Sequence, residues 1–341
     1  MPRAGIVRTM LPLADAYGRV ATDLRVSLTD RCNLRCTYCM PPEGLDWMPD
    51  DQLLTNDELV RLVRIGVERL GIGSVRLTGG EPLLRQDLPQ IIAAVADLTP
   101  RPTIALTTNG IGLARRAGDL KAAGLDRINV SLDTLDPARF QVMTRRRRHA
   151  DVLAGIRAAK EAGLEPVKIN SVLMRGLNDD EAPALVDWAG REGVQLRFIE
   201  QMPLDAQHGW RRDRMVTADE ILASLAGHGL RPVAAEGTVR GSAPSELFRV
   251  GDTSQLVGVI ASVSRPFCGA CDRVRLTADG QIRNCLFSRT EDDLRTALRS
   301  GASDEEIAEQ WVRAVAGKHP GHGINDPSFL QPDRPMSAIG G

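Results

Sequence analysis

Residues 23–39 read DLRVSLTDRCNLRCTYC, and this stretch decides the fold. Its first part alternates apolar and polar side chains, which predicts a β-strand with two different faces over residues 24–28. The strand runs directly into a polar loop that carries Cys32, Cys36 and Cys39. Barrel folds of parallel strands hold their active sites on such loops, at the carboxyl ends of the strands. The stretch therefore predicts a parallel α/β fold with a functional thiol loop at one edge.

Strand and helix patterns alternate along the chain downstream of this stretch. Apolar β-branched runs predict strands over residues 75–77, 104–107, 127–132, 167–173 and 196–199. Helical spacing predicts helices between them, over residues 57–70, 88–97, 113–123, 151–162 and 181–191. This alternation is typical of parallel βαβ units. About six units are present, fewer than the eight of a closed barrel, so we predict an α/β fold with a partial (β/α)6 TIM-like barrel over residues 1–229.

The pattern changes after about residue 230. Short β-like pieces follow over residues 247–250, 256–261 and 274–276, with a second group of cysteines and a polar helix or two. Strands and helices that do not alternate are typical of an α+β arrangement. We therefore expect a smaller C-terminal α+β domain over residues 230–341.

The composition is that of an ordinary globular protein. The 341 residues are 43% hydrophobic and 26% charged, which is enough apolar material for a sizeable core. Lys and Arg number 43 against 44 Asp and Glu, so the net charge is −1 and a protein that coats nucleic acid is disfavoured. Aromatic residues make up only 4%, which argues against a base-stacking surface. An anionic ligand must therefore be held by a local cluster of basic side chains.

No membrane span or export signal is expected. No apolar run approaches the roughly eighteen residues of a membrane helix. The start, MPRAGIVRTMLPLADAYGRV, lacks the continuous apolar region of a signal peptide. We expect a cytoplasmic protein, and in that reducing compartment the six cysteines are not expected to form disulfides.

The first group of cysteines has the spacing C-x3-C-x2-C, at Cys32, Cys36 and Cys39. Three thiolates on one short loop can hold three irons of a [4Fe–4S] cluster and leave the fourth iron open to another ligand. Structural zinc usually needs four protein ligands, and none of the five histidines lies nearby in the sequence. The loop therefore favours a cluster, with zinc and plain structural thiols as the alternatives.

The second group has the spacing C-x2-C-x13-C, at Cys268, Cys271 and Cys285. The C-x2-C pair often marks zinc. Only three thiolates are available again, so a second cluster with one open iron is as consistent as zinc completed by a distant ligand. Spacing alone does not decide between them.

Side-chain parity predicts a polar lumen. Apolar residues alternate with polar ones on the predicted strands, and in a barrel the apolar face meets the surrounding helices. A lumen of this polarity is costly unless its groups find partners, and a polar ligand supplies them. The alternative is that these residues bond one another in a dry interior. The polar faces carry Arg25, Ser27, Arg76, Thr78, Thr107, Asn109, Asn129, Ser131, Asp133, Lys168 and Asn170.

Four features together resemble a known family. Residues 32–39, CNLRCTYC, match the signature of the radical S-adenosylmethionine (SAM) superfamily, and residues 79–82, GGEP, resemble its motif for the SAM amino group. The second cysteine group sits in FCGACDRVRLTADGQIRNCLF, residues 267–287, and the sequence ends in Gly340-Gly341. Over nearly its full length the chain resembles the GTP 3′,8-cyclase (MoaA) family of molybdenum cofactor biosynthesis.

The resemblance implies a radical lyase reaction that uses two [4Fe–4S] clusters and SAM. In the family, one electron from the first cluster cleaves SAM to methionine and a 5′-deoxyadenosyl radical, which removes the C3′ hydrogen of GTP. The C3′ radical then attacks C8 of guanine and gives (8S)-3′,8-cyclo-7,8-dihydroguanosine 5′-triphosphate. The second cluster helps to hold the guanine. A primary alkyl radical attacks most C–H bonds, so the site must fix C3′ and exclude competing groups.

The resemblance also assigns individual residues. For the clusters it implies Cys32, Cys36 and Cys39, and Cys268, Cys271 and Cys285. For SAM it implies Tyr38, Gly80, Ser131 and Met202. For GTP it implies Arg25, Arg76, Thr107, Lys168, Arg273, Val274 and Arg275, because arginine and lysine are the usual partners of phosphates. The Gly-Gly tail is expected to reach into the active site, whereas the run Arg145–Arg148 is expected to be a solvated segment.

Other functions remain open at this point. A radical SAM enzyme that modifies peptides also carries auxiliary clusters, although usually with more C-terminal cysteines. A zinc-stabilised protein or a ferredoxin-like electron carrier would need neither the GGEP segment nor a polar lumen. For the cyclase, the resemblance implies an electron donor, a homodimer and a downstream cyclic pyranopterin monophosphate synthase as partners, with no nucleic acid and no membrane.

Overall fold

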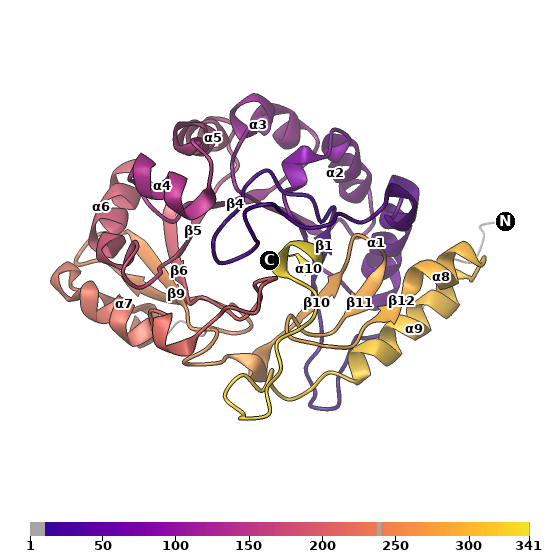
Figure 1. The fold of residues 1–341 in the computed structure, drawn as a ribbon. Coiled ribbons are helices and arrows are strands. Elements are labelled where there is room, and N and C mark those ends of the chain that lie inside the picture. Colours follow the sequence, from indigo (N-terminus) through magenta and orange to yellow (C-terminus); the bar gives the residue numbers. More distant parts are fainter. Residues whose placement is uncertain (1–10, 237–239, 341) are drawn as a thin grey trace.

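One curved sheet organises the molecule. The structure is a computed structural model that describes residues 11–236 and 240–340. Within these residues twelve strands pair in the order β12-β11-β10-β1-β2-β3-β4-β5-β6-β9-β8-β7. Strands β1 to β6 are parallel and curve around a centre, with helices on their outer side (Figure 1). The predicted partial barrel is confirmed.

The barrel elements follow the predicted ones closely. The strands are β1 (Asp23–Ser27), β2 (Ser74–Thr78), β3 (Thr103–Thr108), β4 (Arg127–Ser131), β5 (Val167–Val172) and β6 (Gln195–Ile199). The predicted helices are α1 (Asn56–Leu70), α2 (Leu88–Ala96), α3 (Leu113–Ala122), α5 (His149–Glu161) and α6 (Ala182–Glu192). Helix α4 (Pro137–Thr144) was not predicted. It begins where the Asp136 carboxylate accepts hydrogen bonds from the amides of Ala138 and Arg139, which is a standard N-cap.

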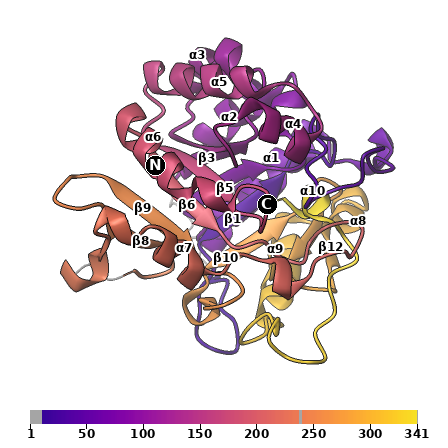
Figure 2. The same ribbon diagram turned by 60° about the vertical axis from the view of Figure 1, so that its left-hand side comes forward.

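The strands after residue 230 extend the barrel sheet on both sides. Strand β10 (Arg273–Leu276) pairs in parallel with β1, and β9 (Leu256–Ile260) pairs in parallel with β6. Helix α7 (Ala218–Ser224) precedes this region, and the remaining elements in it are β7 (Arg231–Pro232), β8 (Glu246–Arg249), β11 (Gln281–Arg283), β12 (Asp292–Asp293), α8 (Leu294–Arg299), α9 (Asp304–Ala316) and α10 (Met336–Ile339). In Figure 2 the β8–β9 hairpin lies on one flank, and α8 and α9 lie on the other. The two parts of the chain thus share one sheet, and the domain boundary at 229/230 stays a prediction.

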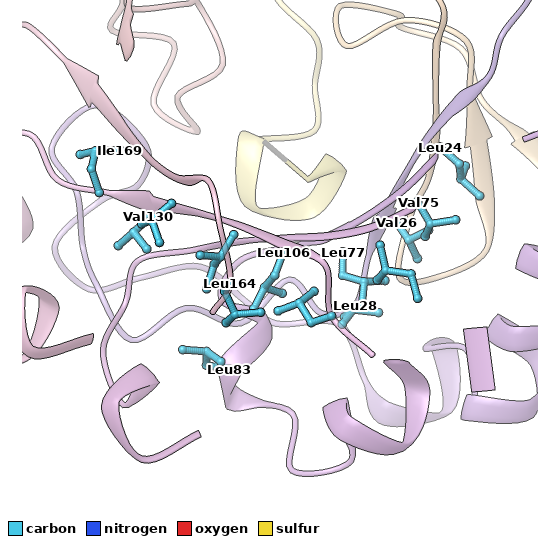
Figure 3. Close-up of a cluster of buried hydrophobic side chains, with 14 of the residues drawn as sticks. Leu24, Val26, Leu28, Val75, Leu77, Leu83, Leu106, Val130, Leu164 and Ile169 are labelled. Atoms are coloured by element: carbon cyan, nitrogen blue, oxygen red, sulfur yellow. The ribbon is translucent and has the colours of Figure 1, made fainter. Parts of the chain in front are cut away.

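The hydrophobic core lies between the sheet and its helices. Leu24, Val26 and Leu28 are fully buried in it, next to Val75 and Leu77 of the neighbouring strand (Figure 3). Each leucine that is removed from water in this way contributes roughly 1.5–3 kcal/mol. The opposite faces of the same strands carry the polar residues. The parity prediction is therefore confirmed, and the apolar half of each strand fixes which residues point inward.

Helix α10 lies in the mouth of the barrel, near the C-terminus (Figure 1). Gly340 follows it with a positive φ of 74°. A Cβ atom at Gly340 would lie only 2.7 Å from Cγ2 of Thr78, so a larger residue does not fit without a shift. Gly340 thus lies against Ser27 and Thr78 of β1 and β2, and the role of the tail in the active site stays a prediction; Gly341 lies outside the described residues. None of the described helices is long and apolar enough to span a bilayer.

Candidate active site

The loop after β1 brings the first three cysteines together. Cys32, Cys36 and Cys39 are all half-buried, and the negative charge that any one thiolate would carry disfavours ionisation of its neighbours. Burial raises the pKa of Cys32 to about 11 and that of Cys39 to about 12. These thiols therefore stay protonated until a metal displaces their protons, which is the usual behaviour of a metal-binding site.

The end of helix α4 holds this loop in place. The amides of Arg35 and Thr37 donate to the carbonyl oxygens of Thr144 and Met143, at 3.0 and 2.9 Å. Arg145 has a left-handed backbone, and its Nη1 donates to the carbonyl oxygen of Arg35 at 2.7 Å. The prediction of a solvated segment is therefore wrong for Arg145, because its side chain is hydrogen-bonded to the backbone of the cysteine loop. Residues 146–148 are exposed as predicted.

The GGEP segment packs its backbone against the cysteine loop. The amide of Gly80 donates to the carbonyl oxygen of Thr29 at 2.7 Å, and that of Glu81 donates to Arg31 at 2.8 Å. A Cβ atom on Gly80 would overlap the carbonyl oxygens of Asp30 and Arg31. Only glycine allows this close approach of two backbones.

Glu81 anchors the same segment from the inside. Its buried carboxylate accepts hydrogen bonds from the amides of Leu83 and Asn109 and from the Thr108 hydroxyl, at 2.7–2.9 Å. Burial nevertheless raises the pKa of Glu81 to about 7. The carboxylate thus ties β2 to the end of β3, directly beneath the loop that carries Cys32.

The substitution Gly80→Ala is expected to disrupt this packing. The added methyl group meets rigid backbone atoms rather than a flexible side chain, and overpacking of this kind costs about 1–3 kcal/mol. We expect a lower unfolding temperature together with weaker SAM binding, measured by thermal unfolding and by equilibrium dialysis. Gly73→Ala is the matched control, because nothing lies within 4 Å of its added Cβ. Equal effects of the two variants would contradict the packing argument.

The four positions predicted for SAM lie beyond the carboxyl ends of different strands. Gly80 follows β2, Ser131 ends β4, and Met202 follows β6. Tyr38, in the cysteine loop after β1, donates its hydroxyl to Asp133 at 2.7 Å, just past β4. Parallel strands end at one edge of the barrel, so all four belong to the same side of the molecule.

The lumen contains a cavity of about 340 Å³ next to the positions predicted for SAM. Six of the seven residues predicted for GTP line it, and so does Met202. Val274 does not join them, because its side chain has the opposite parity on β10 and is buried in the hydrophobic core. The six lining residues are Arg25, Arg76, Thr107, Lys168, Arg273 and Arg275.

The second group of cysteines lines the same cavity. Cys268, Cys271 and Cys285 are half-buried and lie on or near β10 and β11. Helix α10 connects the two groups, because the amide of Ser337 is hydrogen-bonded to the Cys39 sulfur while Met336 lines the cavity. Helix α10 therefore contacts both the first thiol group and the cavity that the second group lines.

The register of the strands stacks positive charges in the lumen. Arg275, Arg25 and Arg76 are direct partners across β10, β1 and β2. Adjacent strands lie only about 4.8 Å apart, so these guanidinium groups repel one another unless an anion joins them. Arg275 also donates to the carbonyl oxygen of Gly340 and so holds the C-terminal tail in the site.

The sequence analysis missed one further cation that lines the cavity, Arg197, and a buried cation on a neighbouring strand, Arg127. Arg197 donates from Nη2 to the side-chain oxygen of Asn170 at 2.7 Å, and Arg127 lies one strand from Lys168 in the sheet. The Nε atoms of both arginines are buried without a hydrogen-bond partner, as are those of Arg25 and Arg76. Side-chain alternation could have predicted both residues. Arg127 lies on the same face of β4 as Asn129, and Arg197 lies at an inward-facing position of β6.

The lumen holds more positive than negative charge. Among the described lining residues there are six cations and two carboxylates, Asp23 and Asp272. Burial, together with the neighbouring cations, lowers the pKa of Arg76 to about 10, of Arg197 to about 9 and of Lys168 to about 8. A dry, self-paired interior would not hold this excess of buried cations over carboxylates. An anion with several charges is the ligand that fits.

The donor sets fit iron–sulfur clusters better than single ions. Each set consists of three thiols, and in the described part of the chain no three Cys, His, Asp or Glu side chains gather closely enough to hold one metal ion. Zinc draws its four ligands to about 2.3 Å, whereas a four-iron cluster spaces its cysteines around a larger body. Three thiols leave a structural zinc ion one ligand short, whereas they match a four-iron cluster with one open iron.

Comparisons with known proteins agree with this site. A model of the radical SAM superfamily matches residues 26–189, and a model described as Molybdenum Cofactor Synthesis C matches residues 194–324. A GTP 3′,8-cyclase of Streptomyces coelicolor is 66% identical over 330 residues, which is 96% of each chain. The chain belongs to the GTP 3′,8-cyclase family. A second relative within this family, GTP 3′,8-cyclase 2 of Mycobacterium tuberculosis, is 59% identical over 98% of this chain and 94% of its own.

Two solved structures with bound S-adenosylmethionine share the fold of this family member. SuiB of Streptococcus suis, bound to S-adenosylmethionine, aligns with a TM-score of 0.60 at 15% identity, over 89% of this chain and 68% of its own. The protein anSMEcpe with bound AdoMet aligns with a TM-score of 0.56 at 15% identity, over 89% and 82%. At this identity the likeness concerns the fold alone.

Proposed function

We propose that the chain is a radical SAM lyase that converts GTP and SAM to (8S)-3′,8-cyclo-7,8-dihydroguanosine 5′-triphosphate, methionine and 5′-deoxyadenosine. This is the first step of molybdenum cofactor biosynthesis. The relatives at 66% and 59% identity favour this reaction over the modification of peptides. A single observation carries the proposal: an excess of buried cations, several with an unbonded Nε, and the second thiol group line one cavity beside the radical SAM loop.

The first cluster would be held by Cys32, Cys36 and Cys39, and the second by Cys268, Cys271 and Cys285. When bound, the first cluster supplies the electron that cleaves SAM, and the second supplies an open iron for the guanine. The chain itself supplies placement. Tyr38, Gly80, Ser131 and Met202 are positioned to bind SAM at the carboxyl edge of the barrel.

The lumen cations are suited to hold the triphosphate. GTP carries roughly four negative charges, and guanidinium groups bind phosphates with paired hydrogen bonds. Arg25, Arg76, Lys168, Arg273 and Arg275 surround the space where such charges would lie, and Thr107 adds a hydroxyl. Anchoring the phosphates fixes C3′ of the ribose relative to SAM, and the walls of the cavity keep other C–H bonds away.

Anaerobic incubation with SAM, GTP and a chemical reductant tests the proposal. Mass analysis is expected to detect the cyclised nucleotide, together with 5′-deoxyadenosine that forms only when GTP is present. Iron analysis is expected to give about eight irons per chain, as two clusters require. SAM cleavage that proceeds equally without GTP, with no new nucleotide, would refute the assignment. Zinc in place of iron would remove every radical SAM function.

The affinity for GTP is expected to fall as the pH rises through about 8. Burial and the neighbouring cations lower the pKa of Lys168 to about 8, so its ammonium is charged below that pH and neutral above it. Only the charged form attracts phosphate, so binding is accompanied by proton uptake near this pH. Calorimetry in buffers of different ionisation enthalpy measures this uptake. A Lys168→Arg variant should bind without it, and uptake that persists in the variant would point to another group.

Several partners remain proposals. The reaction needs a one-electron donor, and its product would pass to a cyclic pyranopterin monophosphate synthase. We also expect a homodimer in the cytoplasm, with no nucleic acid or membrane partner. Sedimentation of the iron-loaded protein tests the dimer.

A further inference from the structure

A buried lysine contacts the second group of cysteines. Lys318 follows helix α9 and is only 5% exposed. Its Nζ lies 3.4 Å from the Cys271 sulfur, 3.2 Å from the carbonyl oxygen of Cys271 and 2.8 Å from that of Arg273. An ammonium has three N–H donors, and these three acceptors use all of them. Among the described residues no carboxylate pairs with Lys318, so its charge is directed at the thiol.

A charge in this position acts on any cluster that Cys271 binds. Hydrogen bonds to the ligand sulfurs and the local net charge are two of the factors that set the reduction potential of an iron–sulfur cluster. A positive charge stabilises the reduced form, which is the more negative one. The same two backbone contacts also fix Cys271 relative to β10.

We propose that Lys318 is a tuning residue of the second cluster: its ammonium hydrogen-bonds the Cys271 sulfur and raises the reduction potential of that cluster. The inference rests on the second cluster of the proposed function. It assigns Lys318 no contact with GTP or SAM. Its effect is therefore on the cluster itself, and a cluster measurement detects it without turnover.

Redox titration followed by electron paramagnetic resonance tests the proposal. The full chain with Cys32, Cys36 and Cys39 changed to alanine isolates the second cluster. In this background Lys318→Met is expected to shift the potential to a more negative value, because both the charge and the hydrogen bond are lost. Lys318→Gln, which keeps an N–H donor, should shift it less, and Lys318→Arg least. Lys121→Met is the matched control, because Lys121 lies on α3 and its Nζ donates to the carbonyl oxygen of Gly163.

Each outcome decides the question. An unchanged potential in a Lys318→Met protein that retains its iron would overturn the proposal. If that variant loses its iron, the Gln and Arg variants give the same comparison. In the unmodified protein, pulsed resonance in H₂O and D₂O should reveal an exchangeable proton coupled to the second cluster, and its absence would also overturn the proposal. If no second cluster forms in the unmodified protein, the proposed function fails instead.

An independent observation concerns the surface beside the first cysteine loop. Arg146, Arg147 and Arg148 are exposed, and Val142 on the preceding helix is 58% exposed; we call these four residues the arginine patch. Asp151, which pairs with Arg148, is the only carboxylate partner of the patch among the described residues.

The position of the patch links it to electron transfer. Arg145, which precedes the exposed run, donates to the backbone of Arg35, next to Cys36. The patch is therefore separated from a cluster ligand by a few bonded residues. Positive surfaces with an exposed apolar residue suit the docking of acidic proteins, and they raise association rates by about 10-fold or more. The near-neutral chain, by contrast, does not suit nucleic acid.

We infer that the arginine patch docks a small acidic protein that carries one electron to the first cluster. This inference also rests on the proposed function. The test compares SAM cleavage driven by a reduced acidic flavodoxin with cleavage driven by titanium(III) citrate. In an Arg146→Glu, Arg147→Glu variant, the flavodoxin-driven rate is expected to fall about tenfold and lose its salt dependence, while the titanium-driven rate is unchanged.

A second double variant serves as the control for the arginine patch. Arg191→Glu, Arg313→Glu makes the same charge change at exposed positions on α6 and α9 and should leave both rates unchanged. No loss of the flavodoxin-driven rate, or an equal loss of both rates, would overturn the docking site. Failure of the unmodified protein with titanium would instead count against the proposed function. Retention of RNA by the unmodified protein but not by the variant would reassign the patch to nucleic acid.

Discussion

Cys32→Ser is expected to abolish the cleavage of SAM. The three thiols of the loop are the ligands proposed for the first cluster, and a serine hydroxyl is a poor ligand for iron at neutral pH. Without that cluster no electron reaches SAM, so neither 5′-deoxyadenosine nor a cyclised nucleotide should form. Chromatography of the anaerobic reaction measures both products. The same result is expected for Cys36→Ser and Cys39→Ser.

Cys285→Ser is expected to behave differently from the three variants of the first loop. Cys285 lines the lumen cavity just after β11, whereas the first loop is held by α4 and by the backbone of the GGEP segment. These supports are separate, so the first cluster should still assemble and contribute about four irons per chain. GTP binding and turnover should be lost. Loss of both clusters from either change would contradict two independent sites, and normal GTP turnover in Cys285→Ser would remove the second site from the mechanism.

The barrel and most of the residues that line its lumen were predictable from the sequence, because side chains alternate between the two faces of a strand. Leu24, Val26 and Leu28 must meet the helices, so Arg25 must point inward, whatever the details of the loops. Backbone parity thus placed six of the seven predicted GTP residues in one cavity. The same rule explains the exception, since Val274 lies between two inward-facing arginines and must face outward.

Contacts between distant segments were not predictable in this way. The pairing of β10 with β1 joins residues about 250 positions apart, and no local pattern specifies it. Arg145 belongs to a run of four arginines that is typical of a solvated loop, yet its side chain bonds a backbone oxygen brought close by the fold. Arg127 and Arg197 had the right parity, but only the fold shows that Arg197 lines one cavity with Lys168 and that Arg127 lies on the neighbouring strand.

Changing Arg76 or Arg197 to methionine is expected to weaken GTP binding by about ten- to a hundredfold. A hydrogen bond to a charged group contributes about 1.5–3 kcal/mol, and about 1.4 kcal/mol corresponds to tenfold in affinity. The same changes should raise the unfolding temperature of the ligand-free protein. Burial and neighbouring cations lower the pKa of both guanidinium groups, which means that the folded protein holds these charges at a cost.

The two effects together separate a binding role from a structural one. Calorimetric titration with GTP and thermal unfolding measure them on the same anaerobic sample. Arg101→Met is the matched control, because Arg101 is exposed and paired with Asp126 on the outside of the barrel. It should leave GTP affinity unchanged. Weaker binding combined with a lower unfolding temperature in Arg76→Met would indicate that Arg76 supports the fold, and unchanged affinity would remove it from the triphosphate site. Electrostatics predicts that each methionine variant is more stable than the parent protein and binds GTP more weakly. The lumen cations repel one another in the ligand-free protein, and their charges become favourable only when a polyanion binds among them.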